Sequence, residues 1–170
     1  IGPAIDNGFY YDIDTEVTFT PDVLEKIEAE MKKIIKQGHK LERFVLPKAE
    51  ALELMKDNPY KVELINELPE DEEISFYKQG DFTDLCAGPH LFDISKIKAV
   101  KVTQCTGAYW RADAKNKVLQ RVYGISFPKA AELEAYLIAL EEAKKRDHRR
   151  IGKELGLFMF TDEGPGFPFF

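Results

Sequence analysis

Residues 74–85, ISFYKQGDFTDL, carry the clearest β signal in the chain. The segment is rich in β-forming residues and has turn chemistry at Gly80-Asp81, so it predicts a β-hairpin. Two more β-rich segments follow at 99–110 and 117–126, with Asn116 and its neighbours supplying the turn between them. Consecutive strands joined by short turns are typical of an antiparallel sheet.

Upstream of this hairpin, strand and helix patterns alternate. Thr20-Pro21-Asp22 predicts a helix start, with Thr20 as the cap and Pro21 at the first helical position, and Gly38 predicts its end. The other expected elements are a strand at 9–13, a strand at 40–46, a helix at 47–56, and a segment at 60–68 that is ambiguous between helix and strand and is assigned here as a short helix.

From Pro128 onward, apolar residues recur at helical spacing, and the pattern continues through Arg150. It predicts one helix of roughly 20 residues or more, with a strongly charged second half. Gly164-Pro165-Gly166 then marks the end of regular structure. Together these patterns predict an α+β fold, in which a mainly antiparallel sheet packs with helices and a long helix leaves the domain.

The composition is that of a globular chain without a membrane span. Of the 170 residues, 44% are hydrophobic and 32% charged, and no apolar run approaches the roughly 20 residues needed to cross a bilayer. The net charge of −6 argues against a broadly basic nucleic-acid-binding surface, although a local patch is enough for RNA contact. Two cysteines, Cys86 and Cys105, are too few for a disulfide framework and favour a reducing, cytoplasmic setting.

The densest group of reactive residues is Asp84–His90, DLCAGPH. Gly88-Pro89 forbids a regular helix, so the group is expected on a loop at the end of a strand. Cys86 and His90 suit metal ligation, or activation of water with a neighbouring carboxylate as orienter. A lone Cys-x-x-x-His pair is often accidental, however, and two side chains are too few for a zinc site, which needs three or four.

Asp84–His90 also resembles the second half of the signature of the threonyl- and alanyl-tRNA synthetase editing fold, in the CAGPH form of the threonyl branch. Further segments are similar to bacterial-type threonyl-tRNA synthetases in the expected order: residues 1–12, 106–111, 119–124 and 145–155. The resemblance covers essentially the whole chain. It implies the α+β fold of that editing domain.

The resemblance also implies a domain plan: an editing domain at 1–127, a linker helix at 128–156 and the start of a class II aminoacylation domain at 157–170. The first half of the signature, a His-x-x-x-His helix, has no match, because the only histidines are His39, His90 and His148. We expect it to precede Ile1, with both chain ends being cuts through a larger protein. No cofactor is expected for this chain; ATP, Mg²⁺ and zinc belong to an aminoacylation domain expected beyond Phe170.

The family's editing residues match positions of this chain. The resemblance implies that His90 positions or activates the attacking water and that Asp84 anchors the substrate amino group or the water. It implies that Lys61 stabilises the oxyanion or the departing ribose oxygen, although by sequence alone Lys61 is an ordinary surface lysine. Cys86 is expected to form a wall of the pocket. Tyr11 and the backbone around Gly2 are expected to border the adenosine.

A run of cations at 144–153 has two readings of similar weight. It is either a solvated helix face or a contact with the phosphates of the tRNA acceptor arm. The residues expected to make that contact are Lys145, Arg146, Arg149 and Arg150. Trp110 is expected in the core rather than as a platform for stacking bases.

These observations favour an editing hydrolase within a threonine-tRNA ligase, acting on serine-charged threonine tRNA at its 3′ end. Two alternatives stay open: a zinc-dependent ester hydrolase using Cys86 and His90, and a tRNA-docking or linker module with a vestigial pocket. We expect this chain alone to be nearly inactive. The full enzyme is expected to be a homodimer, whereas this chain need not dimerise.

Overall fold

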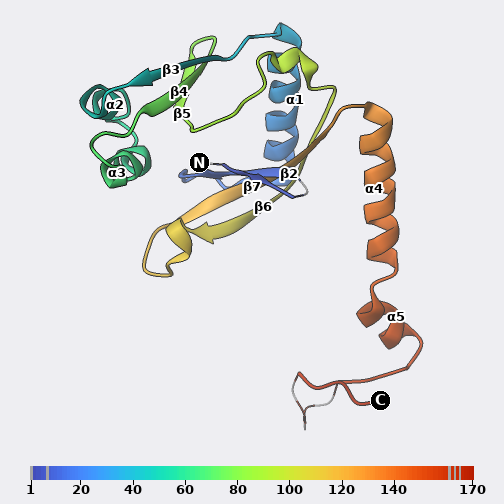
Figure 1. Cartoon of the computed structure of the whole chain (residues 1–170). Helices are drawn as coiled ribbons and strands as arrows, with labels where there is room; N and C mark the ends of the chain where they lie inside the picture. The colour runs from blue at the N-terminus through green and yellow to red at the C-terminus, as the bar shows by residue number, and fades with distance from the viewer. Residues whose placement is uncertain (1, 7, 161, 163, 165) are drawn as a thin grey trace. The chain divides into compact units, whose positions relative to one another are not determined.

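The computed structural model describes residues 2–6, 8–160, 162, 164 and 166–170 (Figure 1). The chain divides into two compact units, residues 1–128 and 129–170, and each is described by itself. The end of regular structure expected at 164–166 includes Pro165, which lies outside the described residues.

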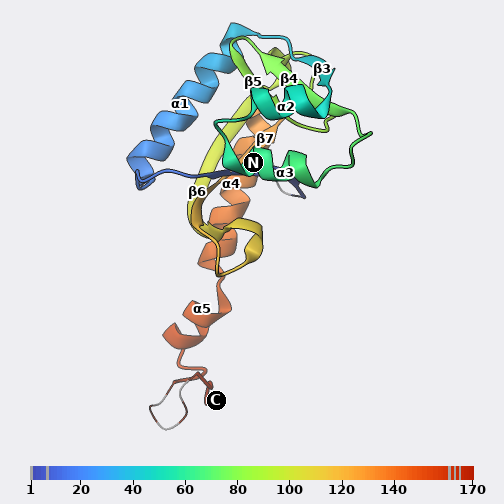
Figure 2. The same cartoon turned by 90° about the vertical axis from the view of Figure 1, so that its left-hand side faces the viewer.

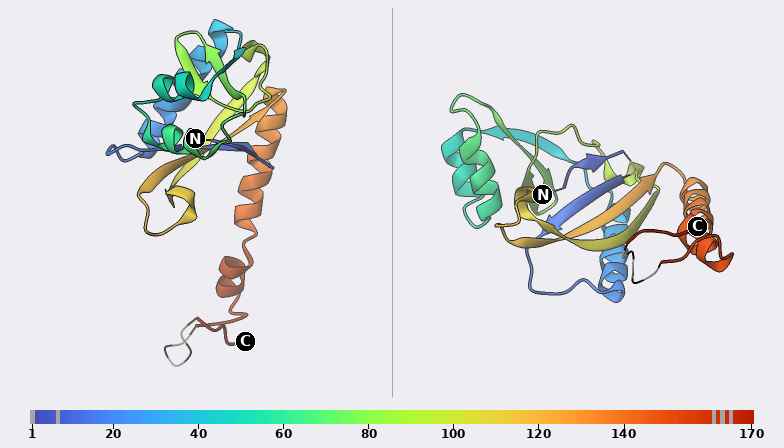
Figure 3. Two further views of the ribbon diagram at one scale, coloured as in Figure 1. Left: turned by 60° about the vertical axis from the view of Figure 1, so that its left-hand side comes forward. Right: turned by 90° about the horizontal axis from the view of Figure 1, so that it is seen from below.

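Within the described part of the first unit, one sheet has four antiparallel strands in the order β1-β2-β7-β6. They are β1 (Ala4–Ile5), β2 (Gly8–Ile13), β6 (Ala99–Tyr109) and β7 (Val118–Phe127). Figure 3 shows β2, β7 and β6 side by side in its view from below. The buried apolar side chains of β6 and β7 are Ala99, Val100, Val102, Leu119, Val122 and Ile125.

Helix α1 (Pro21–Gln37) lies against β6. Pro21 occupies the start of the helix and Gly38 ends it in the left-handed conformation, at φ 67°, as the sequence predicts. The expected Thr20 side-chain cap is wrong, because the Thr20 carbonyl, and not its hydroxyl, accepts the first helical N–H groups. The carboxylate of Glu28 is buried and accepts the Val102 N–H at 3.1 Å, which joins the middle of α1 to the sheet.

A second antiparallel sheet is formed by β3 (Glu42–Leu46), β4 (Ile74–Gln79) and β5 (Phe82–Leu85), with β4 in the centre. Helices α2 (Lys48–Leu54) and α3 (Pro59–Glu67) lie beside it (Figure 2). Their shared core is Ala51, Met55, Ile65, Ile74 and Phe76. The predicted hairpin and the short helix at 60–68 are thus confirmed.

The sequence predicts one sheet, whereas the described residues form two. The physical reason lies after β5, which ends at Leu85: the chain then passes through the loop with Gly88-Pro89 and through η1 (Ile94–Lys96) before β6 begins. Both sheets are antiparallel, so the predicted fold class is confirmed.

A polar clamp joins the four-stranded sheet to α3. The turn η2 (Trp110–Ala112) follows β6, and Trp110 Nε1 donates a hydrogen bond to Glu63 at 3.1 Å. Arg111 forms ion pairs with Glu63 at 2.9 Å and with Glu67 at 2.6 Å. The clamp therefore fixes α3, and the residues that it carries, next to the β6–β7 turn.

The second unit contains α4 (Ala130–Lys145) and α5 (His148–Glu154). The predicted single helix through Arg150 is wrong, because Asp147 interrupts it and its side chain caps the backbone N–H of Arg149 at 2.9 Å. After α5, the ring of Phe158 packs on Gly152, and Met159 pairs with Phe169. No described helix of either unit is long and apolar enough to cross a membrane.

Candidate functional site

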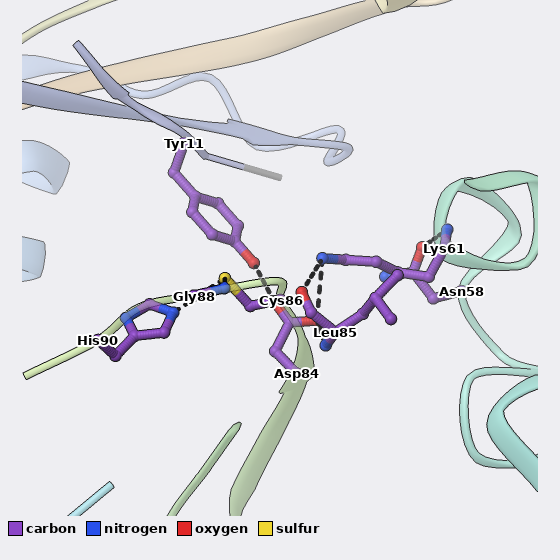
Figure 4. A network of polar contacts seen from close by, with 8 residues as sticks. All are labelled: Tyr11, Asn58, Lys61, Asp84, Leu85, Cys86, Gly88 and His90. Carbon is purple, nitrogen blue, oxygen red and sulfur yellow. Dashed lines mark hydrogen bonds and ion pairs between the residues drawn. The ribbon is translucent and has the colours of Figure 1, made fainter. Parts of the chain in front are cut away.

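Two elements of the first unit, β2 and α3, bring polar side chains to Asp84, which lies near the end of β5 (Figure 4). Lys61 of α3 places its Nζ 3.0 Å from Oδ1 of Asp84. Tyr11 of β2 donates its hydroxyl to Oδ2 at 2.9 Å. The backbone N–H of Leu85 donates to Oδ1 at 2.8 Å. Asp84 therefore links a strand of the four-stranded sheet to α3.

Lys61 is a buried cation rather than the ordinary surface lysine that its sequence context indicates. It is 5% exposed, in the first turn of α3, where its backbone N–H is capped by the side chain of Asn58 at 3.1 Å. Ile65, one turn later, lies in the core and turns this face of α3 inward. A buried ammonium needs a counter-ion, and Asp84 supplies it.

Tyr11 is held in its neutral form. Its partial burial raises the pKa of the phenol well above the ordinary value of 10.0, and the negative charge and hydrogen bond of Asp84 raise it further. The hydroxyl therefore remains a donor at physiological pH.

Cys86 and His90 lie together on the loop that follows β5. Ser75 of β4 anchors this loop, because its hydroxyl donates to the Cys86 carbonyl at 2.6 Å and its carbonyl accepts the Cys86 N–H at 3.1 Å. Nε2 of the exposed His90 lies 2.9 Å from Sγ of Cys86, and the Gly88 N–H points at the same sulfur from 3.4 Å (Figure 4). The thiol and the imidazole are thus in direct contact.

The metal alternative has only this pair of donors in the described structure. No group of three or more His, Cys, Asp or Glu side chains that could hold a metal occurs among the described residues. Cys86 and His90 would need at least one further ligand from elsewhere to hold zinc.

The predicted editing residues open onto a single hollow of about 1000 Å³. Those lining it are Gly2, Tyr11, Lys61, Asp84, Cys86 and His90. At Gly2, an added Cβ would overlap the carbonyl of Tyr10 and crowd the ring of Tyr11, so this position beside β2 requires glycine. The structure therefore brings together residues that are separated by up to 88 positions in the sequence, from Gly2 to His90.

Among the residues of β4 that line the hollow, Ser75 and Tyr77 contact the loop of Cys86 and His90, although sequence reasoning did not identify them. Ser75 holds the Cys86 loop, and the ring centroid of Tyr77 lies 4.4 Å from that of His90. The available signal was the alternation in β4, where Ser75 and Tyr77 share one face and Ile74 and Phe76 lie in the core on the other.

The four cations expected to contact tRNA lie in the second unit, and each has a carboxylate partner nearby. Lys145 and Arg146 pair with Glu142 at 3.1 and 3.7 Å. Arg149 pairs with Asp147 at 2.8 Å, and Arg150 with Glu154 at 3.4 Å. All four side chains are exposed, so these pairs are weak and open to exchange for phosphate.

Comparisons with known proteins agree with the family resemblance of the sequence. Residues 74–123 match the family described as the threonyl and alanyl tRNA synthetase second additional domain. Over its whole length, the chain is 66% identical to the threonine–tRNA ligase of Clostridium botulinum (strain Kyoto / Type A2). It is 67% identical to that of Clostridium tetani (strain Massachusetts / E88). The chain spans 27% of the length of each relative.

Proposed function

Because the chain belongs to the threonine–tRNA ligase family and contains a match to its second additional domain, we propose that the first unit is an editing site. The proposed reaction is hydrolysis of the ester that joins serine to the 3′-terminal adenosine of threonine tRNA. Water attacks the ester carbonyl, the bond to the ribose oxygen breaks, and free serine and uncharged tRNA leave.

The need for such a reaction follows from the chemistry of the two amino acids. Serine lacks one methyl group of threonine, and a missing methyl is worth only about 1–3 kcal/mol of discrimination in a binding pocket. A second, hydrolytic site multiplies the selectivity of the first.

The observation that supports this proposal is the hollow itself, which presents a carboxylate, an ammonium and an imidazole together. Asp84 has about four acceptor positions, and Lys61, Leu85 and Tyr11 occupy three of them, so one remains on Oδ2 for the substrate amino group. In the proposed reaction, the Lys61 ammonium stabilises the oxyanion or the departing ribose oxygen.

The exposed imidazole of His90 takes the proton of the attacking water and returns it to the ribose oxygen. Cys86 holds the imidazole and forms a wall of the hollow; it is not a nucleophile, because hydrolysis by water needs no covalent step. Tyr11 and the backbone at Gly2 border the adenosine.

The proposal also assigns the domains of the chain and a tRNA contact. Residues 1–127 form the editing domain, 128–156 the linker and 157–170 the start of the aminoacylation domain, whose ATP-dependent charging of threonine tRNA lies beyond this chain. Exposed cations of the linker contact the tRNA acceptor arm. The two free cysteines, Cys86 and Cys105, accord with a cytoplasmic enzyme.

The deciding experiment is hydrolysis of serine-charged threonine tRNA. It compares this chain with a form extended N-terminally by the relatives' sequence and with His90→Ala in that extended form. We expect only the extended wild type to deacylate, since the added sequence is expected to supply the His-x-x-x-His half of the signature. An inert extended form, or a fully active His90→Ala variant, would contradict the proposal and favour a docking module.

The zinc-hydrolase alternative is tested on the same extended form. Treatment with a chelator, followed by measurement of bound zinc and of deacylation, separates the two mechanisms. Activity that disappears with zinc and returns on its addition would favour the alternative.

A further inference from the structure

Tyr77 lines the hollow and has no role in the proposed chemistry. It belongs to β4, on the face that carries Ser75. Its ring meets the imidazole of His90 nearly edge to face, with centroids 4.4 Å apart and an interplanar angle of 66°. Its hydroxyl has no hydrogen-bond partner among the described residues.

His90 needs this contact because little else restrains it. The side chain is exposed, and among the described residues its one hydrogen-bonding contact is with Cys86 Sγ at 2.9 Å. One such contact fixes a single ring nitrogen but allows the imidazole plane to turn about it. An edge-to-face aromatic contact restricts that rotation, since such pairs have a preferred geometry.

We propose that Tyr77 is the positioning residue for His90, acting through its ring and not through its hydroxyl. The inference rests on the proposed function for its catalytic meaning. Its structural content, that the Tyr77 ring sets the orientation of His90, is independent of that function.

The loop around Gly88 is shaped to Tyr77 as well. Gly88 has φ 77°, and an added Cβ would overlap the Tyr77 hydroxyl. Tyr77 is also the cross-strand partner of Asp84 in the pairing of β4 with β5. The same residue thus pairs through its backbone with the strand that carries Asp84 and contacts His90 of the following loop through its ring.

The first test uses this chain alone and follows the imidazole proton resonances of His90 by NMR, with His39 and His148 as internal references. A neighbouring aromatic ring displaces these resonances from their positions in a flexible peptide. We expect the displacement to persist in Tyr77→Phe, which keeps the ring, and to vanish in Tyr77→Leu. Unchanged His90 resonances in Tyr77→Leu would overturn the proposal whatever the activity of the chain.

The second test measures deacylation of serine-charged tRNA by the extended form. Since a misplacement of about 1 Å can cost up to 100-fold in rate, Tyr77→Leu is expected to lower kcat by about tenfold or more with KM nearly unchanged. Tyr77→Phe is expected to stay within about twofold of wild type, and in a His90→Ala background Tyr77→Leu should cause no further loss.

The outcomes separate the two proposals. An equal loss in Tyr77→Phe and Tyr77→Leu would assign the role to the hydroxyl and overturn the inference. An extended wild type without activity would overturn the proposed function, while the NMR comparison would still decide whether Tyr77 orients His90.

Discussion

At Asp84, one carboxylate meets a buried ammonium, a phenol and a backbone N–H. The sequence alone assigns Lys61 to the surface, because nothing in its neighbours reveals that α3 turns this side chain inward. Only the family resemblance singled it out. Sequence spacing could not predict the contact of Tyr11 with Asp84, 73 positions away, because that contact depends on how two separate sheets pack.

Asp84→Asn tests the ion pair at this residue. The change leaves Lys61, which is 5% exposed, without a counter-ion. Because Asp84 keeps some solvent contact, we expect a loss of about 2–4 kcal/mol in the free energy of unfolding, somewhat below the cost for a fully buried pair. Urea unfolding measures this loss.

The control is Glu30→Gln, which breaks the exposed Lys33–Glu30 pair and should cost less than about 0.5 kcal/mol. Equal losses in both variants would mean that the Lys61–Asp84 pair is not buried in solution.

Tyr11 makes the free energy of unfolding depend on pH in the alkaline range. Burial, followed by the charge and hydrogen bond of Asp84, raises the pKa of Tyr11 in the folded state above the ordinary 10.0, so the unfolded chain loses this proton first. The stabilising contribution is complete below about pH 10 and declines as the pH rises further. Between about pH 9 and 11, the wild type should therefore lose more unfolding free energy than Tyr11→Phe.

Denaturant titrations at the two pH values test this comparison. Tyr60, whose pKa is raised to about 12 chiefly by its hydrogen bond to Asp14, contributes with the same sign in both proteins and cancels in the difference. Parallel losses in the two proteins would show that folding does not raise the pKa of Tyr11.

At the scale of elements, the loop after β5 is the part whose shape the site depends on most. Gly88→Ala adds a Cβ at φ 77° that overlaps the Tyr77 hydroxyl, and we expect it to cost about 1–3 kcal/mol of unfolding free energy. Gly80→Ala is the control, at φ 58° in the same unit, where the new Cβ would make only ordinary contacts with His39.

Combining Gly88→Ala with Tyr77→Phe removes the atom nearest to the new Cβ. Part of the loss should return, but not all, because the backbone strain and the contact with the ring carbon Cζ at 2.9 Å remain. Thermal or urea unfolding of the four proteins measures the coupling. Strictly additive losses would show that the loop moves away from Tyr77.

The elements themselves were largely predictable, since hairpin 74–85, helix 21–37 and strands 99–109 and 118–127 follow from local patterns. The errors arose where a single residue overrides a continuing pattern. The helical pattern of apolar residues continues past Asp147, but the helix stops there because the Asp147 side chain accepts a hydrogen bond from the Arg149 N–H. The division into two sheets depends on the long crossing from β5 to β6, which has no periodic signal.

For the whole molecule, the proposal that linker cations contact tRNA predicts a salt-dependent affinity. Replacing Lys145, Arg146, Arg149 and Arg150 by glutamine should weaken binding of threonine tRNA and reduce the slope of log K against log salt by up to about 2–4. In a control variant, glutamine replaces four exposed lysines of the first unit: Lys26, Lys33, Lys36 and Lys56. Filter binding over a range of salt concentrations measures both, and equal slopes in the two variants would assign the effect to net charge alone.

The charge lining the hollow has a consequence for what it admits. Glu72 and Glu73 stand at its wall, and the Lys61 ammonium is already matched by Asp84, so the resting hollow presents no surplus of positive charge. A free amino acid carries a carboxylate that such a lining repels, whereas an esterified amino acid has lost that charge and keeps only its ammonium. If the proposed function holds, the hollow therefore binds free serine more weakly than serine that is esterified to tRNA.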